Sequence, residues 1–158
     1  MPLIVLQAEP APSPAGGLPF LLLFGGMWLL LSAVLAWAGG WRTLARHYPA
    51  RAPGADRTIR GASASVGSPP LPVNYNNCLT VRVTEAGVEI SVWPMFRFQH
   101  PPVFIPWSEL EACEPGRRWL LYVVQILPRQ GPPVMFRGRA ARAVLAGWEA
   151  WGPRTAAA

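Results

Sequence analysis

Few residues in this 158-residue chain have the types and spacing that enzymes use. The two histidines are His47 and His100, and His100 precedes two prolines in a setting typical of a turn rather than of a general base. Cys78 and Cys113 form no Cys-x-x-Cys pair and have no adjacent histidine, which argues against a zinc site. The sequence also lacks Walker, Gly-x-Gly-x-x-Gly and Gly-x-Ser-x-Gly motifs. We therefore expect no catalytic, cofactor-binding or metal-binding residues and a protein that is not an enzyme.

The basic side chains are a second source of chemistry, since guanidinium groups bind phosphates. Fourteen basic residues, all of them Arg, face eight acidic ones and give a net charge of +6. They are divided between one cluster after an apolar run and scattered turns, a distribution that disfavours nucleic-acid binding. Solvated surface charge is the alternative interpretation of the second set. The candidate anion contacts are Arg117, Arg118, Arg137, Arg139 and Arg142.

A third candidate is the aromatic stretch 93–104, in which large apolar side chains alternate with prolines. One interpretation is that these side chains complete a small core with Trp148 and Trp151. The other is an exposed apolar patch, which usually marks a contact with a partner or a membrane. The candidate partner surface consists of Trp93, Met95, Phe96, Phe98 and Phe104.

The element that would position all of these is an uncharged apolar run from Leu18 to Trp41. At 1.5 Å of rise per residue it gives about 36 Å of helix, enough to cross a hydrocarbon core of about 30 Å. The residues before it contain no Lys or Arg, so a cleaved signal peptide fits less well. Arginines follow the run, which predicts an external N-terminus and a cytoplasmic C-terminal part with Cys78 and Cys113 as free thiols.

Helical spacing predicts that this helix continues past the bilayer to Tyr48, just before Pro49. Aromatic rings suit the headgroup zone, and arginines suit anionic lipid. The candidate membrane and lipid contacts are Trp41, Arg42, Arg46, Tyr48 and Arg51. A row of small residues, Ser32, Ala36 and Gly40, could let two spans approach closely, so a homodimer is possible.

Composition divides the chain into five segments. We expect a disordered N-terminal segment over 1–17, a transmembrane helix with an interfacial extension over 18–48, and a Pro/Gly/Ser-rich linker over 49–73. A first strand, Thr58 to Val66, is possible within the linker. A mainly β domain follows over 74–152, and a tail over 153–158.

Alternation of apolar and polar residues predicts a β-hairpin in the domain, with strands at 78–84 and 88–92 joined by Glu85-Ala86-Gly87. Further strands are expected at 103–107, 119–127 and 134–137, with a turn at Glu114-Pro115-Gly116. An amphipathic helix over 139–151 ends the domain at Gly152-Pro153. Five or six antiparallel strands and one helix predict a curled sheet or partial barrel closed by that helix.

Three stretches carry a resemblance to a known family: Gly40-Trp41-Arg42-Thr43-Leu44-Ala45 with Tyr48-Pro49, Asn74 to Leu79, and His100 to Leu110. The chain resembles small bacterial single-span membrane proteins with a pleckstrin-homology-like (PH-like) cytoplasmic domain of the GRAM or bacterial PH type. The resemblance implies a PH-like partial barrel in a bacterial inner membrane. It carries no catalytic residues to transfer.

These observations lead to one functional hypothesis and one alternative. We expect a membrane-anchored, non-catalytic binding module that presents a protein- or lipid-binding surface at the cytoplasmic membrane face. The alternative is a structural accessory subunit of a larger membrane complex.

Overall fold

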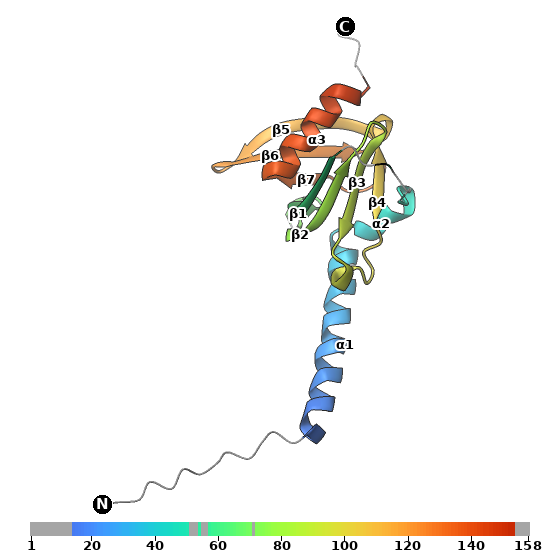
Figure 1. Cartoon of the computed structure of the whole chain (residues 1–158), viewed down its shortest axis with the longest axis vertical. Helices are drawn as coiled ribbons and strands as arrows, with labels where there is room; N and C mark the ends of the chain where they lie inside the picture. Colours follow the sequence, from blue (N-terminus) through green and yellow to red (C-terminus); the bar gives the residue numbers. More distant parts are fainter. Residues whose placement is uncertain (1–13, 51–53, 55–56, 71, 154–158) are drawn as a thin grey trace, which may run out of the picture. The chain divides into compact units, whose positions relative to one another are not determined.

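The chain forms an N-terminal apolar helix followed by a curled seven-stranded sheet and a C-terminal helix, which confirms the predicted fold class (Figure 1). The computed structural model describes residues 14–50, 54, 57–70 and 72–153. It divides the chain into two compact units, Met1–Leu31 and Ser32–Ala158. The candidate sites discussed below all lie in the second unit.

Helix α1, Pro14–Ala38, accounts for the apolar run. Its stretch Gly17–Ala38 has a mean hydropathy of 2.2, and only 6% of its most apolar window is buried, unlike the core helix of a soluble protein. Among the described residues, α1 is the one helix long and apolar enough to cross a membrane.

The helix stops earlier than the sequence predicted. α1 ends at Ala38, and a separate helix α2, Trp41–His47, begins after Gly39 and Gly40. Gly40 has a φ of +72°, which favours glycine, and a Cβ placed there would lie 2.8 Å from Cγ of Pro132. The glycine pair therefore breaks the helix and lets the chain turn closely against the domain.

The apolar face of α2 belongs to the core of the second unit, which corrects the prediction that its aromatic rings lie among lipid headgroups. Trp41 is 1% exposed and Tyr48 5% exposed. The indole Nε1 of Trp41 donates to the carbonyl of Pro101 at 2.9 Å, and the Tyr48 hydroxyl accepts from the backbone N–H of Gln130 at 3.0 Å. Aromatic residues at helical spacing fit a membrane interface and a protein core equally well, and here the domain supplies the partners.

The small-residue row predicted for self-association is also occupied within the chain. Ser32 is 8% exposed and Ala36 is fully buried as part of the core cluster. Gly40 lies beyond the end of α1 and contacts Pro132. These residues therefore do not form a free helix face that a second copy could pack against.

The seven strands form one sheet in the order β4-β3-β2-β1-β7-β6-β5, with antiparallel neighbours throughout. Short 3₁₀ turns, Pro94–Phe96 and Trp107–Glu109, flank β4. The strands are β1 Arg57–Val66, β2 Val73–Val83, β3 Gly87–Val92, β4 Val103–Pro106, β5 Leu110–Arg118, β6 Leu121–Pro128 and β7 Val134–Arg137.

The predicted hairpin is confirmed by its register. Leu79, Val81 and Val83 of β2 oppose Val92, Ile90 and Val88 of β3, as the alternation required. The first strand is a full part of the sheet, because β1 pairs with β2 along nearly its whole length. Ten residues of the segment expected to be a linker, 57–66, therefore form a strand of the sheet.

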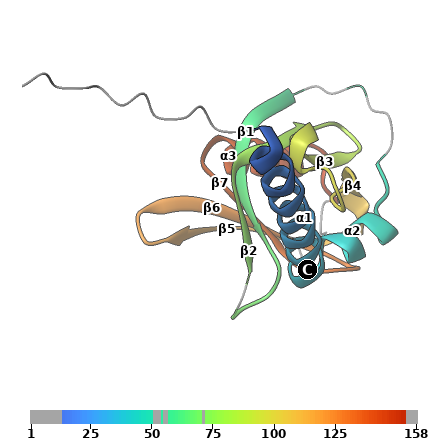
Figure 2. The same cartoon turned by 90° about the horizontal axis from the view of Figure 1, so that it is seen from below.

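Strand β5 is the element that the sequence analysis missed. The Glu114-Pro115-Gly116 segment, which predicted a turn, continues as strand and pairs with β6. Because β5 is an edge strand, the missing N–H of Pro115 removes no hydrogen bond from a second neighbour. The β5–β6 hairpin extends away from the rest of the sheet (Figure 2).

Helix α3, Gly138–Trp151, closes the curled sheet by packing across β1, β2, β5, β6 and β7. Its small residues allow a close approach, most clearly at Gly147, where an added Cβ would lie 2.6 Å from Cγ1 of Val83. Trp107 packs edge-on against Trp148 at 6.3 Å and donates its Nε1–H to the carbonyl of Thr84 at 3.0 Å. The predicted C-terminal helix is thus confirmed as the lid of the core.

Candidate functional site

A basic concave surface of the domain is a groove of about 700 Å³ over the first strands. Its described lining contains five arginines and no acidic residue, together with Thr58, Thr80, Ser91 and Trp93. We call it the arginine groove. Its arginines are Arg57, Arg60, Arg82, Arg97 and Arg139.

Strand register explains how residues far apart in the sequence meet in this groove. Thr58 lies opposite Arg82, and Arg60 lies opposite Thr80, which in turn lies opposite Ser91. Side chains at directly opposed positions share one face of a sheet. The polar face of β1, β2 and β3 is therefore the floor of the groove, while Leu79, Val81 and Val83 point into the core.

One of the five guanidinium groups is neutralised. Glu89 of β3 is buried, and its carboxylate accepts a hydrogen bond from Nη1 of Arg82 at 2.5 Å in an ion pair. A buried carboxylate requires such a partner, so this pair serves the fold. Glu89 also holds Arg82 against the sheet, at the floor of the groove.

The remaining arginines are available to a ligand. Among the described residues, the Arg97 side chain engages one partner, the carbonyl of Val92, to which its Nε donates at 3.3 Å. Arg57, Arg60 and Arg139 are exposed, and within the described ranges none of the three forms an ion pair. Planar guanidinium forks bind phosphate oxygens in pairs. This arrangement suits a phosphate-bearing anion.

The anion contacts predicted from sequence do not meet at one site: only Arg139 lines the arginine groove, although Arg137 and Arg139 together line another pocket. Arg118 and Arg137 line a smaller pocket of about 240 Å³. The Arg137 guanidinium is already engaged there, donating to Ser65 Oγ and to Asn74 Oδ1 at 2.6 Å each. Arg117, near the end of β5, and Arg142, on α3, are exposed.

Sequence reasoning missed the four other arginines of the groove. Arg57 and Arg60 follow the apolar run, where the sequence indicates a topology signal or a contact with anionic lipid but no groove within the domain. The usable signal was alternation: Arg60 and Arg82 each occupy the polar face of a strand. Recognising the groove would have required the β1–β2 register, which depends on a bulge near Gly61 and was not predictable locally.

The predicted lipid contacts are divided in the same way. Arg42 and Arg46 are exposed on α2, where they remain candidates for anionic lipid. Trp41 and Tyr48 are in the core, as described above. Arg51 lies outside the described residues.

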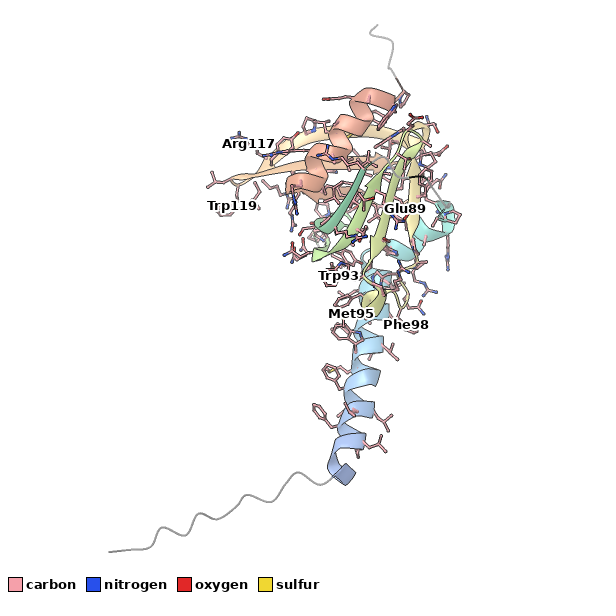
Figure 3. The ribbon with its side chains drawn as sticks, in the orientation of Figure 1. Glu89, Trp93, Met95, Phe98, Arg117 and Trp119 are labelled. Carbon is pink, nitrogen blue, oxygen red and sulfur yellow. The ribbon has the colours of Figure 1, made fainter. Side chains whose placement is uncertain are left out.

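The aromatic stretch is part core and part surface. Phe104 is 5% exposed, and Phe96 packs against the core while partly exposed, so neither is freely available to a partner. Trp93, Met95 and Phe98 are 45%, 68% and 47% exposed and gather at the loop between β3 and β4 (Figure 3). Phe96 and Phe104 are therefore not part of an exposed patch, whereas Trp93, Met95 and Phe98 are exposed.

The surroundings of His100 and Cys113 shift the pKa values of both side chains. His100 is buried, and burial lowers its pKa below the ordinary value of 6.5. Burial raises the pKa of the Cys113 thiol to about 12, and the nearby Glu149 and Glu114 add to that shift. Across the part of the chain that the structure describes, no group of three His, Cys, Asp or Glu side chains could hold a metal ion.

Comparison with known proteins adds no relative to these observations. No protein-family model matches the chain, and no curated protein matches it. The candidate site therefore depends on its own geometry.

Proposed function

We propose that this chain is a single-span membrane protein whose PH-like domain binds anionic lipid headgroups through the arginine groove. The bound surface would be the cytoplasmic face of a bacterial inner membrane, with the N-terminus outside. The observation that carries this proposal is the grouping of Arg57, Arg60, Arg97 and Arg139 around one groove with no acidic residue in its described lining.

The short connection between the domain and the apolar helix α1 favours a lipid over a soluble ligand. α1 is apolar and long enough to cross a bilayer, and the domain begins within three residues of its end. Arg42 and Arg46 are exposed on α2 between that end and the sheet. Each arginine near an anionic surface contributes about 1 kcal/mol to membrane attraction.

The proposal is tested by native mass spectrometry of the full chain in detergent, titrated with phosphatidylglycerol or with phosphatidylcholine. The wild-type chain should retain the anionic lipid preferentially. The double variant Arg57→Gln/Arg60→Gln should weaken that binding by about 2 kcal/mol, or roughly 30-fold, from the contribution of about 1 kcal/mol per arginine.

The matched control is Arg129→Gln/Arg142→Gln, which removes the same charge from exposed positions outside the groove. Equal retention of the two lipids, or an equal loss in the control, would contradict the proposal. Glycerol 3-phosphate as competitor distinguishes a free phosphate from a headgroup: if it displaces the lipid at comparable concentration, the ligand is a soluble phosphate.

A second candidate, an accessory subunit of a membrane complex, is favoured by the tip of the β5–β6 hairpin. Trp119 and Leu120 are 97% and 96% exposed there, which suits contact with another protein (Figure 3). The size of the particle extracted from native membranes in mild detergent tests this candidate. Trp119→Asp should reduce the size of that particle. A monomer-sized particle for both the wild-type protein and the variant would exclude the accessory-subunit function.

A further inference from the structure

The loop between β3 and β4, residues 93–102, presents an apolar tip, of which Trp93 also borders the arginine groove. The tip consists of Trp93, Met95 and Phe98, which are 45%, 68% and 47% exposed. The loop contains no acidic residue, and its one arginine, Arg97, is also exposed. An exposed cluster of this kind usually marks a contact that the isolated chain does not satisfy.

Backbone hydrogen bonds within the loop fix the conformation that exposes the apolar tip. Within a 3₁₀ turn, the N–H of Phe96 donates to the carbonyl of Trp93 at 2.8 Å, and that of Arg97 to Pro94 at 3.2 Å. The N–H of His100 then donates to the carbonyl of Arg97 at 2.9 Å. These consecutive turns hold the three apolar side chains outward at one end of the domain.

The base of the same loop is bound to the residue that starts α2. Trp41 Nε1 donates to the carbonyl of Pro101, and the ring of His100 lies edge-on to that of Trp41 at 5.3 Å. Trp41 is three residues after Ala38, the last residue of α1, so their Cα atoms can be at most about 11 Å apart. The base of the loop therefore lies close to the end of α1.

We infer that the apolar tip inserts into the interfacial layer of the bilayer that α1 crosses, as a second membrane contact of the same chain. The inference depends on the proposed membrane span. Trp and Phe are favoured at that depth, and such contacts enter about 5–10 Å into the headgroup boundary. Arg97, Arg42 and Arg46 are exposed near the same end and supply cations for the headgroups.

The experiment places an environment-sensitive nitrobenzoxadiazole label on Met95→Cys in the full chain, reconstituted in lipid nanodiscs. Met95 is 68% exposed and does not line the arginine groove, so this variant should fold and leave that groove intact. Burial raises the pKa of both native thiols, Cys78 and Cys113, which slows their labelling. The wild-type chain treated in the same way measures that background.

The inserted label should show blue-shifted emission, lose most of its fluorescence with 5-doxyl phosphatidylcholine in the disc, and be protected from aqueous iodide. The matched control is Ala146→Cys, exposed on α3, whose label should be quenched by iodide and not by the doxyl lipid. If the label at position 95 behaves like the control, the inference is wrong. Protection from iodide without quenching by the doxyl lipid would identify a protein, or a second copy, as the occupant and would also overturn it.

The two proposals fail separately. Arg57→Gln/Arg60→Gln should reduce anionic-lipid binding while a label at position 95 is still quenched by the doxyl lipid. Met95→Asp should abolish insertion, measured as loss of doxyl-lipid quenching of a label at Phe98→Cys, while anionic-lipid binding persists. A failure of quenching with intact lipid selectivity removes the inserted tip alone.

Discussion

The Tyr75 hydroxyl lies 2.9 Å from Nε2 of His100, and Nδ1 of the same ring lies 3.1 Å from the carbonyl oxygen of Phe98. A neutral imidazole can satisfy both contacts only if Nδ1–H donates to Phe98 and Nε2 accepts from Tyr75. Trp41 packs against both rings. Strand β2, the β3–β4 loop and α2 therefore meet at one buried cluster.

Replacing Tyr75 with Phe should destabilise the domain because Nε2 of His100 would lose its buried partner. The cost of an unsatisfied buried acceptor is about 1–3 kcal/mol. Thermal unfolding of the full chain in detergent measures this effect. Tyr122→Phe, at a half-buried position on β6, provides the reference, and an equal loss in both variants would argue against the cluster.

Stability should fall as pH is lowered through about 6.5 because the pKa of His100 is depressed in the folded state. The unfolded chain, with an ordinary histidine, binds the proton first, so protonation favours unfolding by up to about 1.4 kcal/mol per pH unit. Denaturant unfolding of the full chain between pH 8 and pH 5 measures the slope. His100→Gln should flatten it, and an unchanged slope in that variant would assign the pH dependence to other groups.

Local patterns predicted those elements that depend on local causes. The uninterrupted apolar run gave α1, and the alternation on either side of Glu85-Ala86-Gly87 gave the β2–β3 register. The sequence signal failed where tertiary context decides. Pro115 and Gly116 indicate a turn unless the strand lies at a sheet edge, and Trp41 fits a headgroup layer as well as a core.

The same distinction applies to the candidate site. Nearness in sequence predicted one surface of five residues, of which Trp93, Met95 and Phe98 are exposed while Phe96 and Phe104 are not. The arginine groove was not predicted, because its members come from β1, β2, the β3–β4 loop and α3. Long-range pairing, which brings Arg60 and Arg82 onto one face, is not encoded in any short window.

Gly147→Ala should destabilise the protein although alanine is the better helix former by about 1 kcal/mol. The new Cβ would lie 2.6 Å from Cγ1 of Val83 and 2.8 Å from Cζ2 of Trp107. Overpacking a core in this way typically costs about 1–3 kcal/mol. Ala146→Gly, at an exposed position on the same helix, calibrates the helix contribution. A stabilised Gly147→Ala chain would show that α3 is not packed this closely.

Trp119→Gly should raise stability by about 0.5–1 kcal/mol, because Trp119 adopts a φ of +57° at the hairpin tip while its side chain is 97% exposed. Glycine relieves the backbone and removes no buried contact. The neighbouring Leu120→Gly, at a position of ordinary φ, should instead lower stability by a similar amount. Thermal unfolding of both variants measures these changes. A loss of stability in Trp119→Gly would show that the indole contributes to the fold.

The two-glycine connection after α1 limits the distance that the domain can move from the end of that helix. Because only Gly39 and Gly40 separate the two helices, the arginine groove cannot move far from the end of α1. Under the proposed function, headgroups of the adjoining leaflet would be at a high effective concentration, so even a millimolar intrinsic affinity would keep the arginine groove occupied. Under the same proposal, lengthening this connection with flexible residues would lower that effective concentration without altering a contact residue.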